Sequence, residues 1–293
     1  MYPLWTVAVD PQDGCLYVGR KDIGLVYSSQ DNGATWYESE LLGFDGVSVI
    51  RIMPGDEQEV YCGLIEGGLF RSTDKGKTWN LVENGLPEKL CITDLLIAPA
   101  YKLMILADWE KGLFVSKNGH PWVWALIGRR IYSLVMPPNS DGRLHAAGWG
   151  IHMHSNDSGS TWNDQENTSF VICRLIVNEE TPNIWYAATF YQGFYKSIDG
   201  GTTWNLSNTG LPGWGYNRDI CLAVHPSSAN VLFLGLGSGH TGLYSSKDGG
   251  NTWQDVSDNL VDMHVYGIAF TADGSMVYAA TNKGLFKRTY SCQ

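Results

Sequence analysis

The octapeptide Ser246-Lys247-Asp248-Gly249-Gly250-Asn251-Thr252-Trp253 decides the fold, because its pattern S-x-D-x-G-x-T-W recurs along the chain. Asp can accept hydrogen bonds from backbone N–H groups two residues on, and Gly adopts a positive φ without steric cost. Each copy therefore predicts a β-hairpin turn whose Trp begins the next strand with a large face to bury. Full copies also occupy 29–36, 72–79, 155–162 and 197–204, and a damaged copy occupies 116–124.

The spacing of these copies predicts seven repeated units. The first Ser of each copy stands at 29, 72, 116, 155, 197 or 246, and one more step of similar length reaches Arg288. There Gly284-Leu285-Phe286-Lys287 repeats the lead-in that precedes other copies, such as Gly68-Leu69-Phe70-Arg71. Units of about 42 residues are typical of the four-stranded blade of a β-propeller.

We therefore predict an all-β, seven-bladed β-propeller of four-stranded antiparallel blades that forms a single domain over residues 1–293. The β-branched and aromatic runs bounded by Gly, Pro and Asp are typical of strands. After Tyr290 too few residues remain for a fourth strand, so we expect three strands in the last blade and closure by side-chain packing against the first. Expected blades span approximately 1–45, 46–88, 89–129, 130–169, 170–213, 214–260 and 261–293.

Composition narrows the function classes. The chain has 20 Lys and Arg against 30 Asp and Glu, and it shows no basic cluster. A nucleic-acid partner is not expected, since phosphate binding needs a basic surface. No apolar run is long enough for a membrane span. Five cysteines without C-x-x-C spacing are predicted to be small buried core residues: Cys15, Cys62, Cys91, Cys173 and Cys221.

The sequence predicts neither a metal nor a cofactor. His152 and His154 alternate along a strand near His145, but no Asp, Glu or Cys completes a ligand set. No phosphate-binding loop or nucleophile elbow is found. Residues 1–5 show no signal peptide, so the compartment is cytoplasmic if Met1 is the native start and extracytoplasmic if a leader was removed.

The five full copies resemble the Asp-box (BNR) repeat. That repeat occurs in sialidases, in xyloglucan-active endoglucanases with two propellers, in sortilin-type receptors and in seven-bladed photosystem assembly factors. The chain is closest in style to the photosystem assembly factors and to single propellers of the xyloglucan-active enzymes. The resemblance covers the whole chain as architecture and implies no single activity. The sialidase R-I-P motif is interrupted by Met53 in the segment 51–54.

A finer resemblance concerns residues 20–27. This segment, R-K-D-I-G-L-V-Y, is similar to the R-T-D-[VI]-G-G-x-Y stretch of the xyloglucan-active endoglucanases and departs from it at two positions. The resemblance implies a catalytic carboxylate at Asp22, with the partner carboxylate on a second propeller that this sequence lacks. Inverting hydrolysis needs two carboxyl groups about 6.5–9.5 Å apart. Asp108 or Asp94 would have to supply the second, and the alternative is that Asp22 is a turn carboxylate.

The predicted binding face lies opposite the repeated turns. It is built from the loops between second and third strands and from the beginnings of the inner strands. Aromatic residues that the repeat does not require gather there, and such side chains can stack on sugars or anchor a peptide. The alternative is that they plug the channel or pack between blades. The candidate ligand-binding residues are Trp109, Trp149, Tyr191, Trp214, Tyr216, Arg218, His240 and Tyr266.

Three hypotheses about function follow from these observations. The first is a non-enzymatic binding or assembly module that holds a protein segment or a glycan on this face. The second is a glycoside hydrolase, xyloglucanase-like or sialidase-like, that uses Asp22 with a second carboxylate. The third is a subunit of a larger assembly that pairs through the exposed edge of blade seven.

Overall fold

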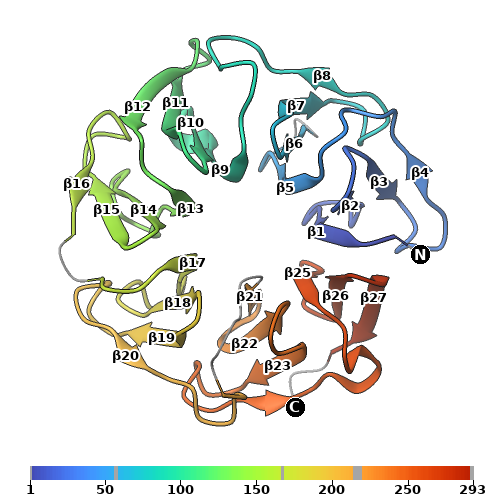
Figure 1. Ribbon diagram of the computed structural model, residues 1–293, viewed down its shortest axis with the longest axis vertical. Helices are drawn as coiled ribbons and strands as arrows, with labels where there is room; N and C mark the ends of the chain where they lie inside the picture. Colours follow the sequence, from blue (N-terminus) through green and yellow to red (C-terminus); the bar gives the residue numbers. More distant parts are fainter. Residues whose placement is uncertain (1, 56–58, 166–167, 214–219, 291–293) are drawn as a thin grey trace.

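Seven antiparallel sheets surround a central channel in the computed structural model, which describes residues 2–55, 59–165, 168–213 and 220–290 (Figure 1). Six sheets have four strands and the seventh has three. In each blade the first strand lies at the channel and later strands follow toward the rim. The predicted all-β, seven-bladed propeller is therefore confirmed, including its three-stranded last blade.

The strands repeat the same order in every blade. The inner strands are β1 (Leu4–Val9), β5 (Val47–Ile52), β9 (Ile92–Ala98), β13 (Ile131–Val135), β17 (Ile172–Val177), β21 (Ile220–His225) and β25 (Val265–Phe270). The second strands are β2 (Leu16–Arg20), β6 (Val60–Leu64), β10 (Leu103–Asp108), β14 (Leu144–Gly148), β18 (Trp185–Thr189), β22 (Ser228–Leu236) and β26 (Met276–Thr281). The third strands are β3 (Val26–Ser29), β7 (Gly68–Ser72), β11 (Gly112–Lys117), β15 (Ile151–Ser155), β19 (Gly193–Ser197), β23 (Gly242–Ser246) and β27 (Gly284–Thr289). The outer strands are β4 (Tyr37–Glu38), β8 (Asn80–Leu81), β12 (Val123–Ile127), β16 (Asn163–Asp164), β20 (Asn205–Leu206) and β24 (Gln254–Asp255), and two 3₁₀ turns span Pro99–Tyr101 and Asp258–Leu260.

The repeated octapeptide forms the same turn in all five full copies. Its Ser hydroxyl donates to the Asp carboxylate over 2.7–2.9 Å and accepts the N–H of the Gly over 2.8–2.9 Å. The Asp then accepts the N–H and the hydroxyl of the Thr four residues on. The Asp was predicted to accept N–H groups two residues further on, and the structure corrects this separation to four residues. The hydrogen bond between the Ser hydroxyl and the Gly N–H turns the backbone around the carboxylate and brings the Thr back to it. The outer strand begins one residue after the Trp, not at it.

The damaged copy at 116–124 shows how the turn changes when the Asp is missing. Ser116 has no Asp two residues on, and its hydroxyl donates to the carbonyl of His120 over 2.6 Å instead. Asn118 takes a left-handed φ of 55° in the shortened turn. The following strand β12 is five residues long, whereas the outer strands after full copies have two. Loss of the Asp thus changes the turn without removing the outer strand.

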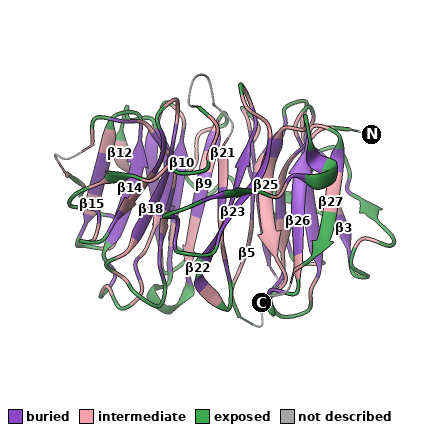
Figure 2. Ribbon diagram, turned by 90° about the horizontal axis from the view of Figure 1, so that it is seen from below, coloured by how far each residue is buried: buried purple, intermediate pink, exposed green. Residues whose placement is uncertain are grey.

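Hydrogen bonds between neighbouring inner strands join the blades at the channel. Ser48 donates to the carbonyl of Ile92 over 2.5 Å, and Thr93 donates to that of Ile131 over 2.6 Å. Further on, the N–H of Leu175 donates to the Ser133 hydroxyl over 3.1 Å. Such bonds are directional and at least partly buried, and they help to fix the rotation of each blade against the next. Burial is greatest in the middle of the strands, between the two loop-covered faces (Figure 2).

The ring closes between the first and last blades. Leu4 and Val7 of β1 pack with Tyr278 and Ala280 of β26 in one buried apolar cluster. No described strand of the N-terminal segment pairs with β27, which is the outer edge of its sheet. Closure by side-chain packing, as predicted, is therefore what the described residues show.

Candidate functional site

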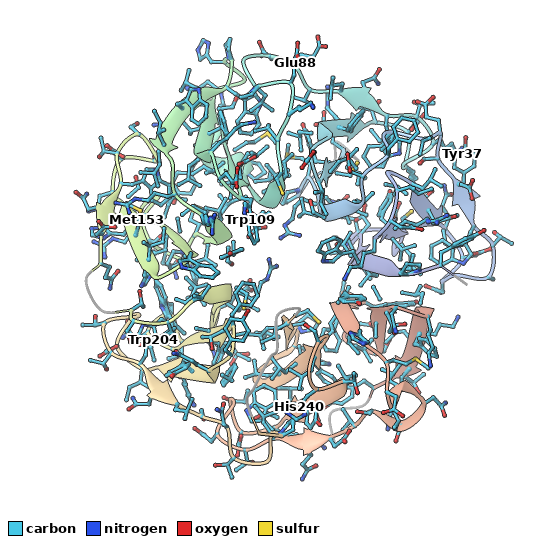
Figure 3. The ribbon with its side chains drawn as sticks, in the orientation of Figure 1. Tyr37, Glu88, Trp109, Met153, Trp204 and His240 are labelled. Carbon is cyan, nitrogen blue, oxygen red and sulfur yellow. The ribbon has the colours of Figure 1, made fainter. Side chains whose placement is uncertain are left out.

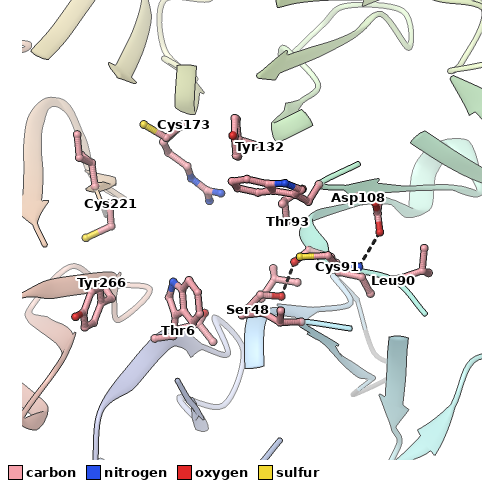
Figure 4. Close-up of a pocket in the computed structure, with 18 of the residues that line it drawn as sticks. Thr6, Ser48, Leu90, Cys91, Thr93, Asp108, Tyr132, Cys173, Cys221 and Tyr266 are labelled. Atoms are coloured by element: carbon pink, nitrogen blue, oxygen red, sulfur yellow. Dashed lines mark hydrogen bonds between the residues drawn. The ribbon is translucent and has the colours of Figure 1, made fainter. Parts of the chain in front are cut away.

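A cavity of about 860 Å³ occupies the channel on the face away from the octapeptide turns (Figure 4). Its wall is built from two positions that recur from blade to blade. The first is the second residue of the inner strand. In six blades this residue is a bulge, because the pairing register with the second strand shifts there. The bulged residues are Trp5, Ser48, Thr93, Tyr132, Cys173 and Tyr266, and all of them line the cavity.

The second recurring position opens the turn between the second and third strands. Its backbone N–H donates to the residue just before the inner strand, as from Trp109 to Cys91 over 2.9 Å and from Phe190 to Val171 over 3.0 Å. The turn is thereby held against the rim of the channel. Ile65, Trp109 and Phe190 occupy this position and line the cavity. Bulges and anchored turns together aim side chains from distant parts of the sequence at one space.

Aromatic rings from blades three to five form a continuous arc along one side of the mouth. Trp109 meets Tyr132 edge to face with ring centroids 5.2 Å apart, and Tyr132 meets Phe190 in the same way at 5.3 Å. Phe190 continues to Tyr191 at 6.1 Å. Arg130 lies over Trp109 at 5.7 Å. We call Trp109, Tyr132, Phe190 and Tyr191 the aromatic arc; Figure 3 shows Trp109 beside the central opening.

The opposite side of the mouth presents a lysine between two rings. The Lys21 ammonium lies 3.8 Å from the Tyr266 ring centroid and 4.7 Å from that of Trp5. These contacts join the first and last blades at the top of the seam. Cation–π contacts of this kind hold a flexible side chain in one position and leave the edges of the rings toward the cavity.

Three charged residues form a waist below the cavity. Arg51 and Arg174 line both this cavity and a second one of about 470 Å³, which also includes Asp94. Asp94 is 2% exposed and accepts hydrogen bonds from Arg51 and from the backbone of Leu95 and Leu134. Arg174 approaches the same carboxylate at 3.5 Å. Two guanidinium groups thus share one carboxylate where the two cavities meet.

The three candidate catalytic carboxylates lie in different settings. Asp22 receives two hydrogen bonds from Arg20, 2.8 and 2.5 Å long, which hold the pKa of Asp22 below its ordinary value. It is not among the described residues that line the cavity. Asp108 does line it, but is 1% exposed and accepts the N–H groups of Cys91, Glu110 and Lys111. Asp94 belongs to the waist.

The other predicted site residues are only partly brought together. Trp109 and Tyr266 line the cavity, and Tyr191 extends the aromatic arc. Trp149 is 49% exposed outside the cavity lining, with its ring 5.8 Å from Arg130. His240 lies over blade six, away from the central opening (Figure 3). Trp214, Tyr216 and Arg218 fall outside the described residues.

The cysteines require a correction. Cys15 and Cys62 are buried core residues as predicted, but Cys91, Cys173 and Cys221 are half-buried and line the cavity. The prediction treated every apolar run as core and overlooked that an inner strand also faces the channel. No disulfide bond joins any of these five cysteines to another within the described residues. Burial raises the pKa of Cys91 to about 11, so its thiol is protonated and weakly reactive at neutral pH.

The three histidines of blade four lie away from the cavity. His145 and His152 are buried, with Nδ1 of the first 3.2 Å from Nε2 of the second. Burial lowers the pKa of His145 to about 2 and that of His152 to about 4, so both are neutral. Among the described residues no group of three His, Cys, Asp or Glu side chains is placed to hold a metal ion. No described helix has the length and apolar character needed to cross a membrane.

The described fold and cavity define a seven-bladed β-propeller with an aromatic-rimmed channel. No family model matches the chain, and no curated protein matches it in sequence. Its fold is similar to that of the GH74 xyloglucanase from Xanthomonas campestris, with a TM-score of 0.79 and 18% identity over 98% of this chain and 52% of that one. The chain thus spans about half the length of this xyloglucanase, as it also does for the GH74 enzyme of Niastella koreensis.

Single propellers are similar along nearly their whole length. YCF48 from Cyanidioschyzon merolae matches with a TM-score of 0.68 and 17% identity over 99% of this chain and 96% of that one. A structure of YCF48 bound to D1 peptide matches with a TM-score of 0.69 and 17% identity over 99% and 94%. At these identities the similarities establish the seven-bladed fold. The neighbours include both hydrolases and a peptide-binding propeller.

Proposed function

We propose that this protein is a non-enzymatic binding module that holds a segment of another protein in the mouth of the channel. The observation that carries the proposal is the aromatic arc, which offers rings from three blades to one cavity. Rigid aromatic side chains at the centre of a concave surface supply most of the binding energy in protein recognition. A cavity of about 860 Å³ is in the range of about 300–1,000 Å³ that suits a ligand of a few residues.

The hydrogen bonds that the candidate carboxylates already accept favour binding over catalysis. Asp108 and Asp94 are almost fully buried, and each accepts two or more backbone N–H bonds. A carboxylate that is buried and held by several hydrogen bonds has little capacity left for a substrate. A hydrolase would need one of these two groups to give up such bonds in order to act with Asp22.

The chemistry of the wall favours a peptide over a neutral glycan. Sugar hydroxyl groups need many side-chain donors and acceptors, yet none of the described lining residues is Asn or Gln. The hydroxyls of Ser48 and Thr93 already bond to backbone carbonyls. The Tyr132 hydroxyl is buried and has no hydrogen-bond partner among the described residues, so it offers little to a sugar. YCF48, which has the same fold, has been solved with a peptide.

A pooled library of random octapeptides, incubated with the full chain and recovered by filtration, tests the proposal. We expect enriched peptides in the bound fraction, with affinity at least roughly 30-fold lower in Trp109→Ala, the loss of one aromatic hot spot of about 2 kcal/mol. The matched control is Trp36→Ala, which removes a 38% exposed Trp on the opposite face. Equal binding by both variants, or binding only on a glycan array, would overturn the proposal.

A glycoside hydrolase is the second candidate, favoured by the similarity to the GH74 xyloglucanase over nearly the whole chain. The pair of hydrogen bonds from Arg20 keeps Asp22 charged at neutral pH, which suits a base or nucleophile rather than an acid. The test is turnover of xyloglucan and of a sialoside panel by the wild-type chain and by Asp22→Asn. Activity that disappears in the variant would promote this candidate; no turnover by the wild-type chain would end it.

We also assign the five repeated turns to the Asp-box (BNR) class. Support comes from the shared hydrogen-bond pattern of their Ser, Asp, Gly and Thr residues. The outer edge of β27 is a further candidate surface, for a strand of a partner in a larger assembly. Its exposed end carries Lys287 and Arg288, whose charges oppose indiscriminate pairing. Light scattering of the purified chain distinguishes a monomer from such an assembly.

A further inference from the structure

The waist of the channel holds more positive than negative charge. Arg51 is well occupied, since it donates to Asp94, to the carbonyl of Leu95 over 3.2 Å and to that of Ile50 over 3.0 Å. Asp94 is also fully used, by Arg51 and by two backbone N–H groups. Arg174 has a single contact within the described residues, 3.5 Å from the Asp94 carboxylate. Most of its five N–H donors therefore have no partner in this part of the chain.

From this arrangement we propose that Arg174 is the anion-binding residue of a carboxylate subsite, which receives the C-terminal carboxylate of the bound protein segment. The inference rests on the proposed function and names the part of the ligand that reaches furthest into the channel. A planar guanidinium group binds a carboxylate with two parallel hydrogen bonds, which gives both energy and orientation. The subsite lies below the aromatic arc, so one ligand could use both.

The surroundings of Arg174 make its positive charge costly unless an anion binds beside it. Its side chain is 34% exposed, and this exposure is toward the channel, because Arg174 lines both cavities. Burial removes water from the guanidinium group and lowers the pKa of Arg174. A cation in such a setting is costly unless an anion and hydrogen bonds compensate it. Asp94 alone cannot compensate two guanidinium groups.

The position of the subsite points to a chain end. The waist separates the cavity of about 860 Å³ from the one of about 470 Å³, and Arg51 and Arg174 contribute to both. A segment that enters from the aromatic mouth therefore meets these side chains at the far end of the larger cavity. An extended C-terminus reaches Arg174 without a turn, whereas an internal Asp or Glu requires two strands of backbone side by side, about 4.8 Å apart.

Two versions of one random octapeptide pool test the inference, one with free C-terminal carboxylates and one with C-terminal amides. Each pool is incubated with the full chain, and bound peptides are quantified by mass spectrometry. We expect the free-acid pool to be retained at least roughly tenfold better than the amide pool, because only the free acid forms the charge-assisted bidentate pair. An oligogalacturonate, which carries its carboxylates on sugar rings, is added as a competitor in a separate arm.

Three variants assign the preference to one side chain. Arg174→Gln should remove the difference between the pools, and Arg174→Lys should keep part of it, since the charge remains without the fork. Arg143→Gln, an exposed arginine that bonds Asn156 across blade four, is the matched control and should keep the full difference. Thermal unfolding of each variant shows that the fold is retained; if Arg174→Gln does not fold, Arg174→Lys carries the test.

The outcomes separate this inference from the proposed function. If both pools bind equally well and both need Trp109, the carboxylate subsite is wrong while the peptide-binding function stands. If the preference for the free acid persists in both Arg174 variants, another group recognises the carboxylate and the inference is also wrong. If neither pool binds, or if only the oligogalacturonate is retained, the proposed function and the inference fall together.

Discussion

Blade four contains a buried pair of imidazoles that should make the stability of this protein sensitive to mild acid. His145 and His152 are 5% and 1% exposed, and their nitrogens approach to 3.2 Å. The edge of the Trp185 ring packs against His145 at 4.5 Å between centroids. His154 and Arg143 are the neighbouring groups whose positive charge further opposes protonation of His145. Both imidazoles are therefore held neutral inside the fold.

The size of the effect follows from the two pKa values. Burial lowers the pKa of His145 to about 2 and of His152 to about 4, whereas an unfolded His titrates near 6.5. Below pH 6.5 the unfolded state thus binds protons that the folded state does not bind. The free energy of unfolding is therefore highest above this pH and decreases as the pH falls below it. Between pH 7 and pH 5 each histidine should cost about 2 kcal/mol, or about 4 kcal/mol for the pair. This is a large part of a typical stability of about 5–15 kcal/mol.

Urea unfolding followed by tryptophan fluorescence at pH 7, 6 and 5 measures this loss. The turn carboxylates do not obscure it, because the pKa of an unfolded Asp, about 3.9, and the pKa of about 2 that hydrogen bonds give Asp157 and Asp199 both lie below pH 5. His145→Leu with His152→Leu should remove the pH dependence over this range, although it also changes stability at pH 7. His120→Gln, at an exposed position, is the matched control. A wild-type loss under about 1 kcal/mol, or the same loss in the double variant, would refute the reasoning.

Three further substitutions test the construction of the ring, each by urea unfolding. Asp74→Ala removes the acceptor of the Ser72 and Thr78 hydrogen bonds and should cost about 1 kcal/mol, since water can replace it at this exposed turn; no loss would mean that the turn does not need its carboxylate. Thr93→Val leaves the carbonyl of Ile131 without its 2.6 Å partner and should cost about 1–3 kcal/mol, and a neutral result would show that the bond between blades three and four is dispensable. Gly148→Ala places a methyl group 1.8 Å from the carbonyl oxygen of Arg130 and should cost at least about 2 kcal/mol through backbone displacement; wild-type stability would contradict the described strand pairing.

The blade count could be predicted because the information for each turn is local. In the octapeptide the Ser, Asp, Gly and Thr bond to one another within four residues of chain, so the pattern is complete in any single copy. The three-stranded last blade follows from the same arithmetic. Only the separation between the Asp and the N–H group that it accepts was predicted wrongly. That separation depends on how the Gly between Asp and Thr bends the backbone.

Two of the predicted ligand-binding residues line the cavity: Trp109 in a loop between second and third strands, and Tyr266 at the beginning of an inner strand. Trp109 was found because it breaks the repeat at a position on the predicted face. Ser48, Thr93 and Cys173 were missed, and Cys173 was assigned to the core. A bulge turns each of these toward the channel, and a bulge depends on pairing with the second strand rather than on the residue itself.

The sequence by itself determined seven blades, the strand order within each blade and the face on which the turns lie, because all three follow from a local repeat with a constant period. Only the tertiary structure decided what the channel contains. Arg51 and Arg174 are 43 and 80 residues from Asp94, and Arg51 does not share the position in the repeat that Asp94 and Arg174 have in common. They meet because closure of the ring brings inner strands of blades two, three and five to one waist, where two cations share one carboxylate.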